Sequence, residues 1–187
     1  MSNPPMSRRR SGERPSGERP PAPTLSLRPL GFTPAEIEGI VALYASNPGY
    51  CRASGEYDPD GVDAERVEAD LREEAAAEGS EVLVVRDAEG RLAGLICLLD
   101  RHPGDGLPWI GLLLVGGALH RTGVGRRLVG LVEERFRDEG RSGIRLAVLE
   151  NNPAALAFWT SLGWEEFDRR RDRAMDRPCV VMHKRLG

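Results

Sequence analysis

Two glycines and three arginines stand together where an apolar run gives way to an amphipathic segment, in the stretch LHRTGVGRRLV (119–129). The first turn of a helix has backbone N–H groups without partners inside the helix, and the helix dipole makes that end positive. Gly123 and Gly125 would let a ligand approach the backbone closely. The arginines can add charge-assisted hydrogen bonds. The stretch is therefore a candidate phosphate-binding cradle, although such glycines often serve only to turn the chain.

The common nucleotide-binding motifs do not fit this stretch. No Gly-Lys-Ser/Thr follows the glycines, so it is not a nucleotide P-loop. Leu128 stands where a dinucleotide fingerprint has its third glycine. No acidic residue ends the next strand at the distance that ribose recognition requires. A nucleotide-binding regulator is therefore disfavoured.

Composition limits the classes of function. The 187 residues, 40% of them hydrophobic, suit one ordinary globular domain, and the net charge of −3 argues against nucleic-acid binding. No apolar run approaches the length of a membrane span, and no apolar stretch follows Arg8–Arg10 as a secretion signal would require. Cys51, Cys97 and Cys179 are odd in number and lack metal-ligand spacing. We expect a cytoplasmic protein without a metal site or a nucleic-acid or membrane partner.

The first 23 residues differ in composition from the rest. They are rich in Pro, Ser, Arg and Gly, repeat SGERP in tandem, and contain no aromatic residue and no Val, Leu or Ile. Such a segment cannot bury enough apolar surface to offset the entropy lost on ordering. We expect residues 1–23 to be a disordered tail and residues 24–187 to form one domain.

Periodicity, turn residues and helix caps predict the order β, α, α, β, β, β, α, β, α, β, β. The expected strands are 24–30, 81–86, 91–100, 109–115, 143–149, 164–167 and 179–184. The expected helices are one capped by Thr33 and those over 63–77, 123–139 and 153–162. Residues 47–61 are expected to be a loop, and helix 63–77 should turn Val67, Leu71 and Ala75 inward. The order indicates an α/β or α+β fold in which helices pack on a mixed sheet.

A second motif accompanies the glycine stretch. Residues 144–164 read IRLAVLENNPAALAFWTSLGW, with an Asn after a strand, then Phe-Trp in a short helix, then Leu-Gly-Trp. Both motifs in this order resemble the GNAT superfamily of acetyl-CoA-dependent N-acyltransferases. The resemblance is sharpest over residues 109–164. Gly123 and Gly125 match the family's Gln/Arg-x-x-Gly-x-Gly/Ala loop, and His120 stands at its first position.

The resemblance implies a mostly antiparallel sheet of six or seven strands, flanked by about four helices. Its central parallel strands, 109–115 and 143–149, would splay apart. The pantetheine arm of acetyl-CoA would pair with the exposed backbone, and amides of the glycine loop would hold the pyrophosphate. The implied acetyl-CoA-binding residues are Leu113, Val115, His120, Arg121, Thr122, Gly123, Val124, Gly125, Arg126, Asn152 and Trp159.

Acetyl transfer needs a neutral amine as the nucleophile and a hydrogen-bond donor for the developing oxyanion. The leaving thiolate also needs a proton or another form of stabilisation. The resemblance places Trp159 where many members have a Tyr that protonates the thiolate, and an indole N–H has no useful acidity. A thiol pKa of about 8.5 makes unaided departure tolerable. Strand 109–115 carries no acid, so the candidate bases are Glu150, Asp100 and His102.

The segment 47–60 lies where the family builds its acceptor pocket. Tyr50, Glu56, Tyr57 and Asp58 are candidates for holding the acceptor, and the acids suit a cationic amine. The expected function is direct acetyl transfer, in a ternary complex, to a primary amine of a small molecule or peptide. A homodimer is a possible assembly. The alternative is a CoA-binding sensor or interaction module without catalysis.

Overall fold

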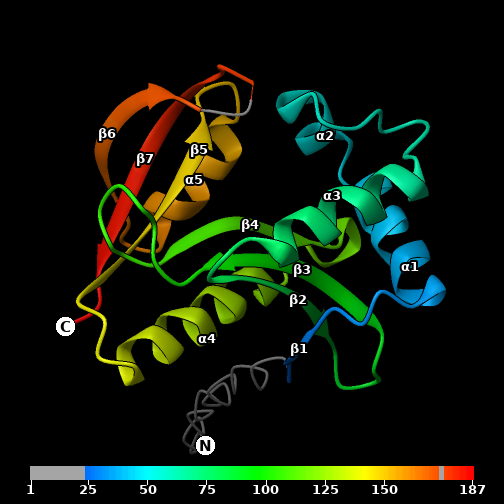
Figure 1. Cartoon of the computed structure of the whole chain (residues 1–187), viewed down its shortest axis with the longest axis horizontal. Helices are drawn as coiled ribbons and strands as arrows, with labels where there is room; N and C mark the ends of the chain where they lie inside the picture. Colours follow the sequence, from blue (N-terminus) through cyan, green and yellow to red (C-terminus); the bar gives the residue numbers. More distant parts are fainter. Residues whose placement is uncertain (1–23, 173–174) are drawn as a thin grey trace, which may run out of the picture.

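The computed structural model describes residues 24–172 and 175–187. A seven-stranded sheet, in the order β1-β2-β3-β4-β5-β7-β6, is flanked by five α-helices (Figure 1). The strands are β1 (Ser26–Pro29), β2 (Ser80–Arg86), β3 (Leu92–Leu99), β4 (Trp109–Val115), β5 (Gly143–Leu149), β6 (Glu165–Arg171) and β7 (Pro178–Arg185). The helices are α1 (Pro34–Ala45), α2 (Pro48–Ser54), α3 (Ala64–Ala76), α4 (Val124–Asp138) and α5 (Pro153–Ser161). The tail expected over 1–23 lies outside the described residues, so the division of the chain stays a prediction.

The sheet confirms the expected fold class. Every pair of neighbouring strands is antiparallel except β4 and β5, which are parallel. The expectation of a loop over 47–61 was wrong for its first half, where α2 forms. Pro48 lies in the first turn of α2, and Gly55 ends it in the left-handed conformation with φ of 70°. Both residues therefore mark helix ends here, although the sequence presents them as ordinary turn residues.

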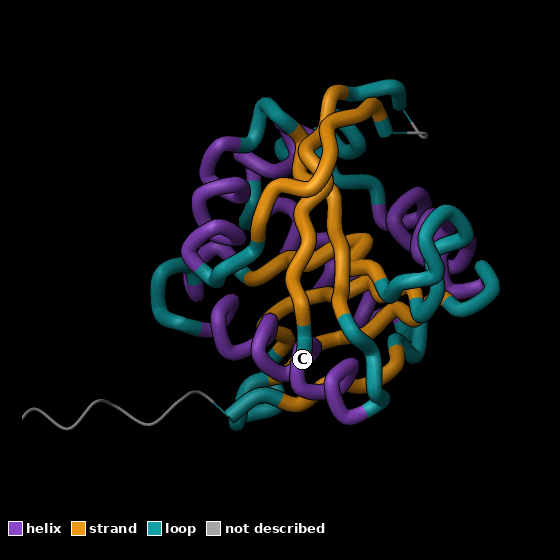
Figure 2. The backbone as a smooth tube through the Cα atoms, turned by 90° about the vertical axis from the view of Figure 1, so that its left-hand side faces the viewer, coloured by secondary structure: helices purple, strands orange, loops and turns teal. Residues whose placement is uncertain are grey.

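The central parallel pair is short. β4 and β5 pair only at Trp109 with Arg145 and at Ile110 with Leu146. β5 stays paired with β7 along its whole length, while β4 follows β3, so the two central strands diverge (Figure 1). Seen from the side, the last strands of the chain run steeply across the others (Figure 2). The expected splay is therefore present, and it leaves one edge of β4 beyond Ile110 without a strand partner.

A β-bulge lies where the splay begins. Leu98 of β3 is opposite Ile110 and Cys97 is opposite Leu112, so Gly111 is the additional residue of β4. Ile110 and Leu112 are two positions apart and yet pack into different hydrophobic clusters, because the bulge reverses the alternation of side chains. Gly111 itself is exposed in the middle of an otherwise apolar strand.

Two hydrophobic clusters cover the two faces of the sheet. One joins the sheet to α4 and α5, and the other joins it to α1 and α3 (Figure 1). Val67 and Leu71 of α3 are buried as expected, but Ala75 is exposed, so its inward assignment was wrong. The buried stripe of α3 ends at Leu71, and both Glu74 and Ala75 are exposed.

Alanine substitutions at two glycines, Gly94 of β3 and Gly130 of α4, should change the stability of the fold in opposite directions. A Cβ at Gly94 of β3 would lie 2.6 Å from Leu114 O, so Gly94→Ala forces the backbone to shift and should cost about 1–3 kcal/mol. A Cβ at Gly130 of α4 meets nothing within 4 Å, so Gly130→Ala should stabilise the fold by about 0.5–1 kcal/mol. Urea unfolding measures both changes. A Gly94→Ala variant as stable as the native protein would contradict this close approach of β3 and β4.

Candidate active site

The glycine stretch forms the turn between β4 and α4. Gly123 caps α4 with φ of 95° and no side chain caps the helix. The Thr122 hydroxyl donates instead to Leu119 O at 2.7 Å. In the described part of the chain, no acceptor is found for the N–H groups of residues 123–126. These amides stand ready for an anion at the positive end of the helix.

The two glycines of the stretch serve different purposes. Gly123 needs its positive φ, and a Cβ there would meet nothing within 4 Å. At Gly125 a Cβ would lie 3.3 Å from the Phe158 ring, so this glycine lets α5 pack against the first turn of α4. Arg121 and Arg126 are exposed, and within the described ranges neither forms an ion pair. Their charge is therefore available beside the amides.

The end of β4 is held from two directions. Asn47 Nδ2 donates to Val115 O at 3.0 Å, and His120 Nε2 lies 3.0 Å from the same oxygen. Asn47 is buried, and its neighbour Ser46 accepts a hydrogen bond from Gly117 N at 3.1 Å. His120 thus fixes the strand end, and the Val115 carbonyl has both acceptor positions filled.

The backbone of β4 still offers groups to the gap. Gly116 N donates to Ala93 O of β3, so in the antiparallel ladder Leu114 points its backbone groups to β3. Leu113 and Val115 point theirs the other way, toward the gap beside β5. Both groups of Leu113 and the N–H of Val115 can therefore pair with an extended ligand.

A cavity of about 200 Å³ opens onto the bulge from the face that carries α1 and α3. Its lining residues are Tyr44, Tyr50, Glu56, Tyr57, Asp70, Leu71, Glu74, Cys97, Gly111 and Leu112. Three of them are acids and none is a cation. The structure thus brings the expected acceptor residues Tyr50, Glu56 and Tyr57 together. Asp58 is not among them, and its carboxylate accepts from Asp60 N.

Hydrogen bonds and burial keep Tyr50, Tyr57 and Cys97 of the cavity in their protonated, neutral form. The Tyr50 hydroxyl donates to Glu56 at 3.1 Å, and the Tyr57 hydroxyl donates to Asp70 at 2.8 Å. Burial raises the pKa of both hydroxyls, and it raises the pKa of Cys97 to about 12. These groups are therefore neutral near pH 7.

The structure does not bring the expected bases to this cavity. Glu150 pairs with Arg169 of β6 at 3.1 Å. Asp100 pairs with Arg141, which follows the C-terminal end of α4, the opposite end of that helix from the glycine stretch. The His102 ring stacks on Trp109 with centroids 4.5 Å apart. A catalytic role for any of these groups stays a prediction.

Two residues expected to contact the cofactor have structural roles. Trp159 is buried, with its ring centroid 5.2 Å from that of Phe158 and 5.0 Å from that of Trp164. The Asn152 side chain accepts from Ala155 N at 3.1 Å and caps α5. Their contacts with a ligand stay predictions.

Sequence reasoning missed several residues that the site gathers, namely Tyr44, Asn47, Asp70, Glu74 and Gly111. A signal was present for three of them. Asp70 and Glu74 follow Val67 at helical spacing on α3, and Gly111 interrupts the apolar run WIGLLLV. Asn47 had no such signal, because its acceptor lies 68 residues away in the chain.

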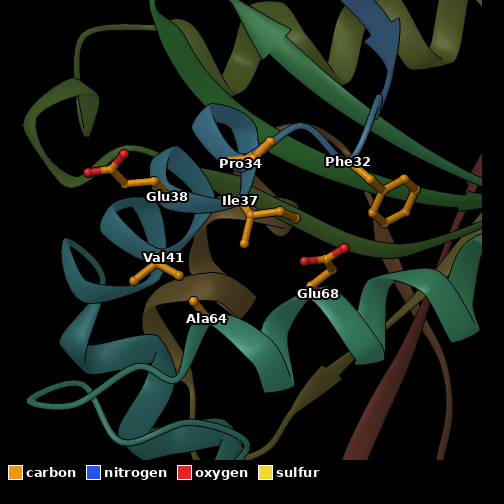
Figure 3. A pocket seen from close by; sticks show the side chains of 7 residues that line it. All are labelled: Phe32, Pro34, Ile37, Glu38, Val41, Ala64 and Glu68. Atoms are coloured by element: carbon orange, nitrogen blue, oxygen red, sulfur yellow. The ribbon is translucent and has the colours of Figure 1, made fainter.

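A larger cavity, of about 390 Å³, lies elsewhere. Residues of α1, α3 and the segment before α1 line it (Figure 3). These residues are Phe32, Pro34, Ile37, Glu38, Val41, Ala64 and Glu68. None is an expected site residue, and the cavity shares no lining residue with the one at the bulge.

Comparison with known proteins decides the family. Residues 47–164 match the model of the family described as "Acetyltransferase (GNAT) family". The chain belongs to the GNAT acetyltransferase family. It is therefore an N-acetyltransferase, and acetyl-CoA is its cofactor.

Solved structures share the GNAT fold of this chain. An acetyltransferase from Thermus thermophilus has 21% identity and a TM-score of 0.68, over 87% of this chain and 97% of that one. Spermidine N-acetyltransferase from Vibrio cholerae, in complex with CoA and spermine, has 18% identity and a TM-score of 0.66, over 87% and 95%. No curated protein sequence matches the chain.

The GNAT glycine loop can be tested with glycines at both ends of α4. Gly123→Ala should weaken CoA binding about tenfold or more. An alanine at this positive φ is strained by about 1–2 kcal/mol, and the backbone shift that relieves the strain moves the amides that face the ligand. Gly140→Ala is the matched control: its φ is 74° and its Cβ also meets nothing within 4 Å, but it follows the other end of α4. Calorimetry with CoA measures both dissociation constants. Equal affinities would contradict the role of Gly123 in the loop.

Proposed function

We propose that the protein transfers the acetyl group of acetyl-CoA directly to a primary amine of a cationic acceptor while both are bound. The acidic cavity that opens on Gly111, where β4 leaves β5, is the observation that carries this proposal. A positive amine bound in this cavity would lie next to the exposed strand backbone.

The donor side has the features that a CoA molecule requires. Amides of residues 123–126 and the exposed Arg121 and Arg126 would hold the pyrophosphate. Leu113 and the N–H of Val115 would pair with the pantetheine arm. When bound, acetyl-CoA supplies an activated acetyl thioester. A backbone N–H of β4 would then stabilise negative charge on the acetyl oxygen.

The acceptor side selects charge. Glu56, Asp70 and Glu74 line the cavity without a lining cation, so their field favours an ammonium group. The similar spermidine N-acetyltransferase binds spermine, a polyamine. A small polyamine or another flexible cationic amine is therefore the acceptor class that we propose.

Direct transfer is favoured over a covalent acetyl-enzyme. Cys97 is the only nucleophilic thiol lining the cavity, and burial raises its pKa to about 12. A thiol in that state is a poor nucleophile. The acceptor amine would therefore attack the thioester itself, and its placement would supply much of the rate.

Thioester consumption with a panel of amines tests the proposal. Polyamines should be acetylated faster than neutral or acidic amines, and initial-rate lines should intersect, as expected for a ternary complex. Cys97→Ala should keep the activity. CoA binding without turnover of any amine would favour the sensor or interaction module instead.

Gly111 permits a sharper test of the cavity. Gly111→Leu fills the space above the strand and should lower kcat/KM for the acceptor about tenfold or more. Gly111→Ala is the control, since its Cβ would have no neighbour closer than 3.7 Å. Calorimetry should show the same CoA affinity for both variants. Full activity of Gly111→Leu would place the acceptor elsewhere.

The homodimer and the cytoplasmic location stay predictions. Across residues 24–172 and 175–187, no helix combines the length and apolar character needed to cross a membrane.

A further inference from the structure

Glu74 lies directly over the strand bulge. Its Oε1 is 4.0 Å from the position that a Cβ on Gly111 would take, and both residues line the cavity. Ser80, the first residue of β2, donates its hydroxyl to the same oxygen at 2.8 Å. The carboxylate is therefore oriented over the point where β4 leaves β5.

Glu74 also differs from the other two acids of the cavity in its partners. Glu56 pairs with Arg177 at 3.1 Å, and Asp70 pairs with Arg66 at 3.7 Å. Within the described ranges, no arginine or lysine lies within ion-pair distance of Glu74. The negative charge of Glu74 is thus the one least compensated by the protein, and an entering ammonium would meet it at the bulge.

The fold gives little reason for an acid at this position. Glu74 lies in the last turn of α3, and that turn carries no basic residue. A negative charge at the C-terminal end of a helix is unfavourable, because it faces the negative end of the helix dipole. Removing the charge should therefore leave the fold intact.

We propose that Glu74 positions the acceptor nitrogen at the bulge and accepts a proton from it. This inference rests on the proposed function. One proton of the ammonium passes to the Glu74 carboxylate, and the freed lone pair forms the N–C bond to the acetyl carbon. The C–S bond breaks with its electron pair on sulfur, and the second proton lost by nitrogen leaves with the thiol. The products are the acetamide, CoA and protonated Glu74, which returns its proton to solvent.

The experiment compares Glu74→Gln with Glu73→Gln in the full chain, with spermine as the probe. Glu73 is exposed, is not a lining residue of the cavity and loses the same charge in the same helical turn, so it is the matched control. Calorimetry in the presence of CoA should show spermine binding about tenfold weaker for Glu74→Gln. kcat should fall about 100-fold, because the amide of the variant cannot accept the proton. Glu73→Gln should match the native protein.

The outcomes separate this inference from the proposed function. Both variants should keep the native melting temperature and CoA affinity, which excludes a merely structural effect. If the native protein acetylates spermine and the two variants behave alike, the role of Glu74 is overturned while the function stands. If the native protein acetylates neither spermine nor any amine of the panel, both are overturned.

Discussion

The short ladder between β4 and β5 is the constraint around which this protein is built. Backbone groups in a sheet must find partners, and a central strand ordinarily finds them on both sides. Here β4 loses its second partner after two residue pairs. Asn47 and His120 satisfy the Val115 carbonyl. The remaining backbone groups facing the gap are left for a ligand that can add itself to the sheet as a strand does.

The two faces of the sheet give this gap opposite electrostatic surroundings. The first turn of α4, with its open amides and exposed arginines, suits the diphosphate of CoA. The cavity under α1 and α3 presents three carboxylates and suits a cation. The bulge at Gly111 joins the two, because a residue without a side chain leaves the backbone accessible from the cavity. Ligands of opposite charge can therefore meet at one point of the strand.

Local signals predicted the elements well where one physical cause acted. The apolar runs of β4 and β5 predicted these strands at their observed bounds, and the Thr33 cap with Pro34 predicted the start of α1. The prediction was wrong where one residue type has two uses. Pro48 and Gly55 mark the ends of α2 as readily as they mark turns. The spacing of Gly123 and Gly125 likewise gave no hint that one serves conformation and the other packing.

The sequence by itself determined the order of elements apart from α2, and the family resemblance, because these depend on neighbours along the chain. Only the tertiary structure decided which acids share a cavity. Glu56, Asp70 and Glu74 come from two segments and reach β4 through packing. It also showed Glu150 and Asp100 in ion pairs with Arg169 and Arg141. Partners so far apart in the chain are chosen by folding, since a carboxylate's role depends on the charges and space around it.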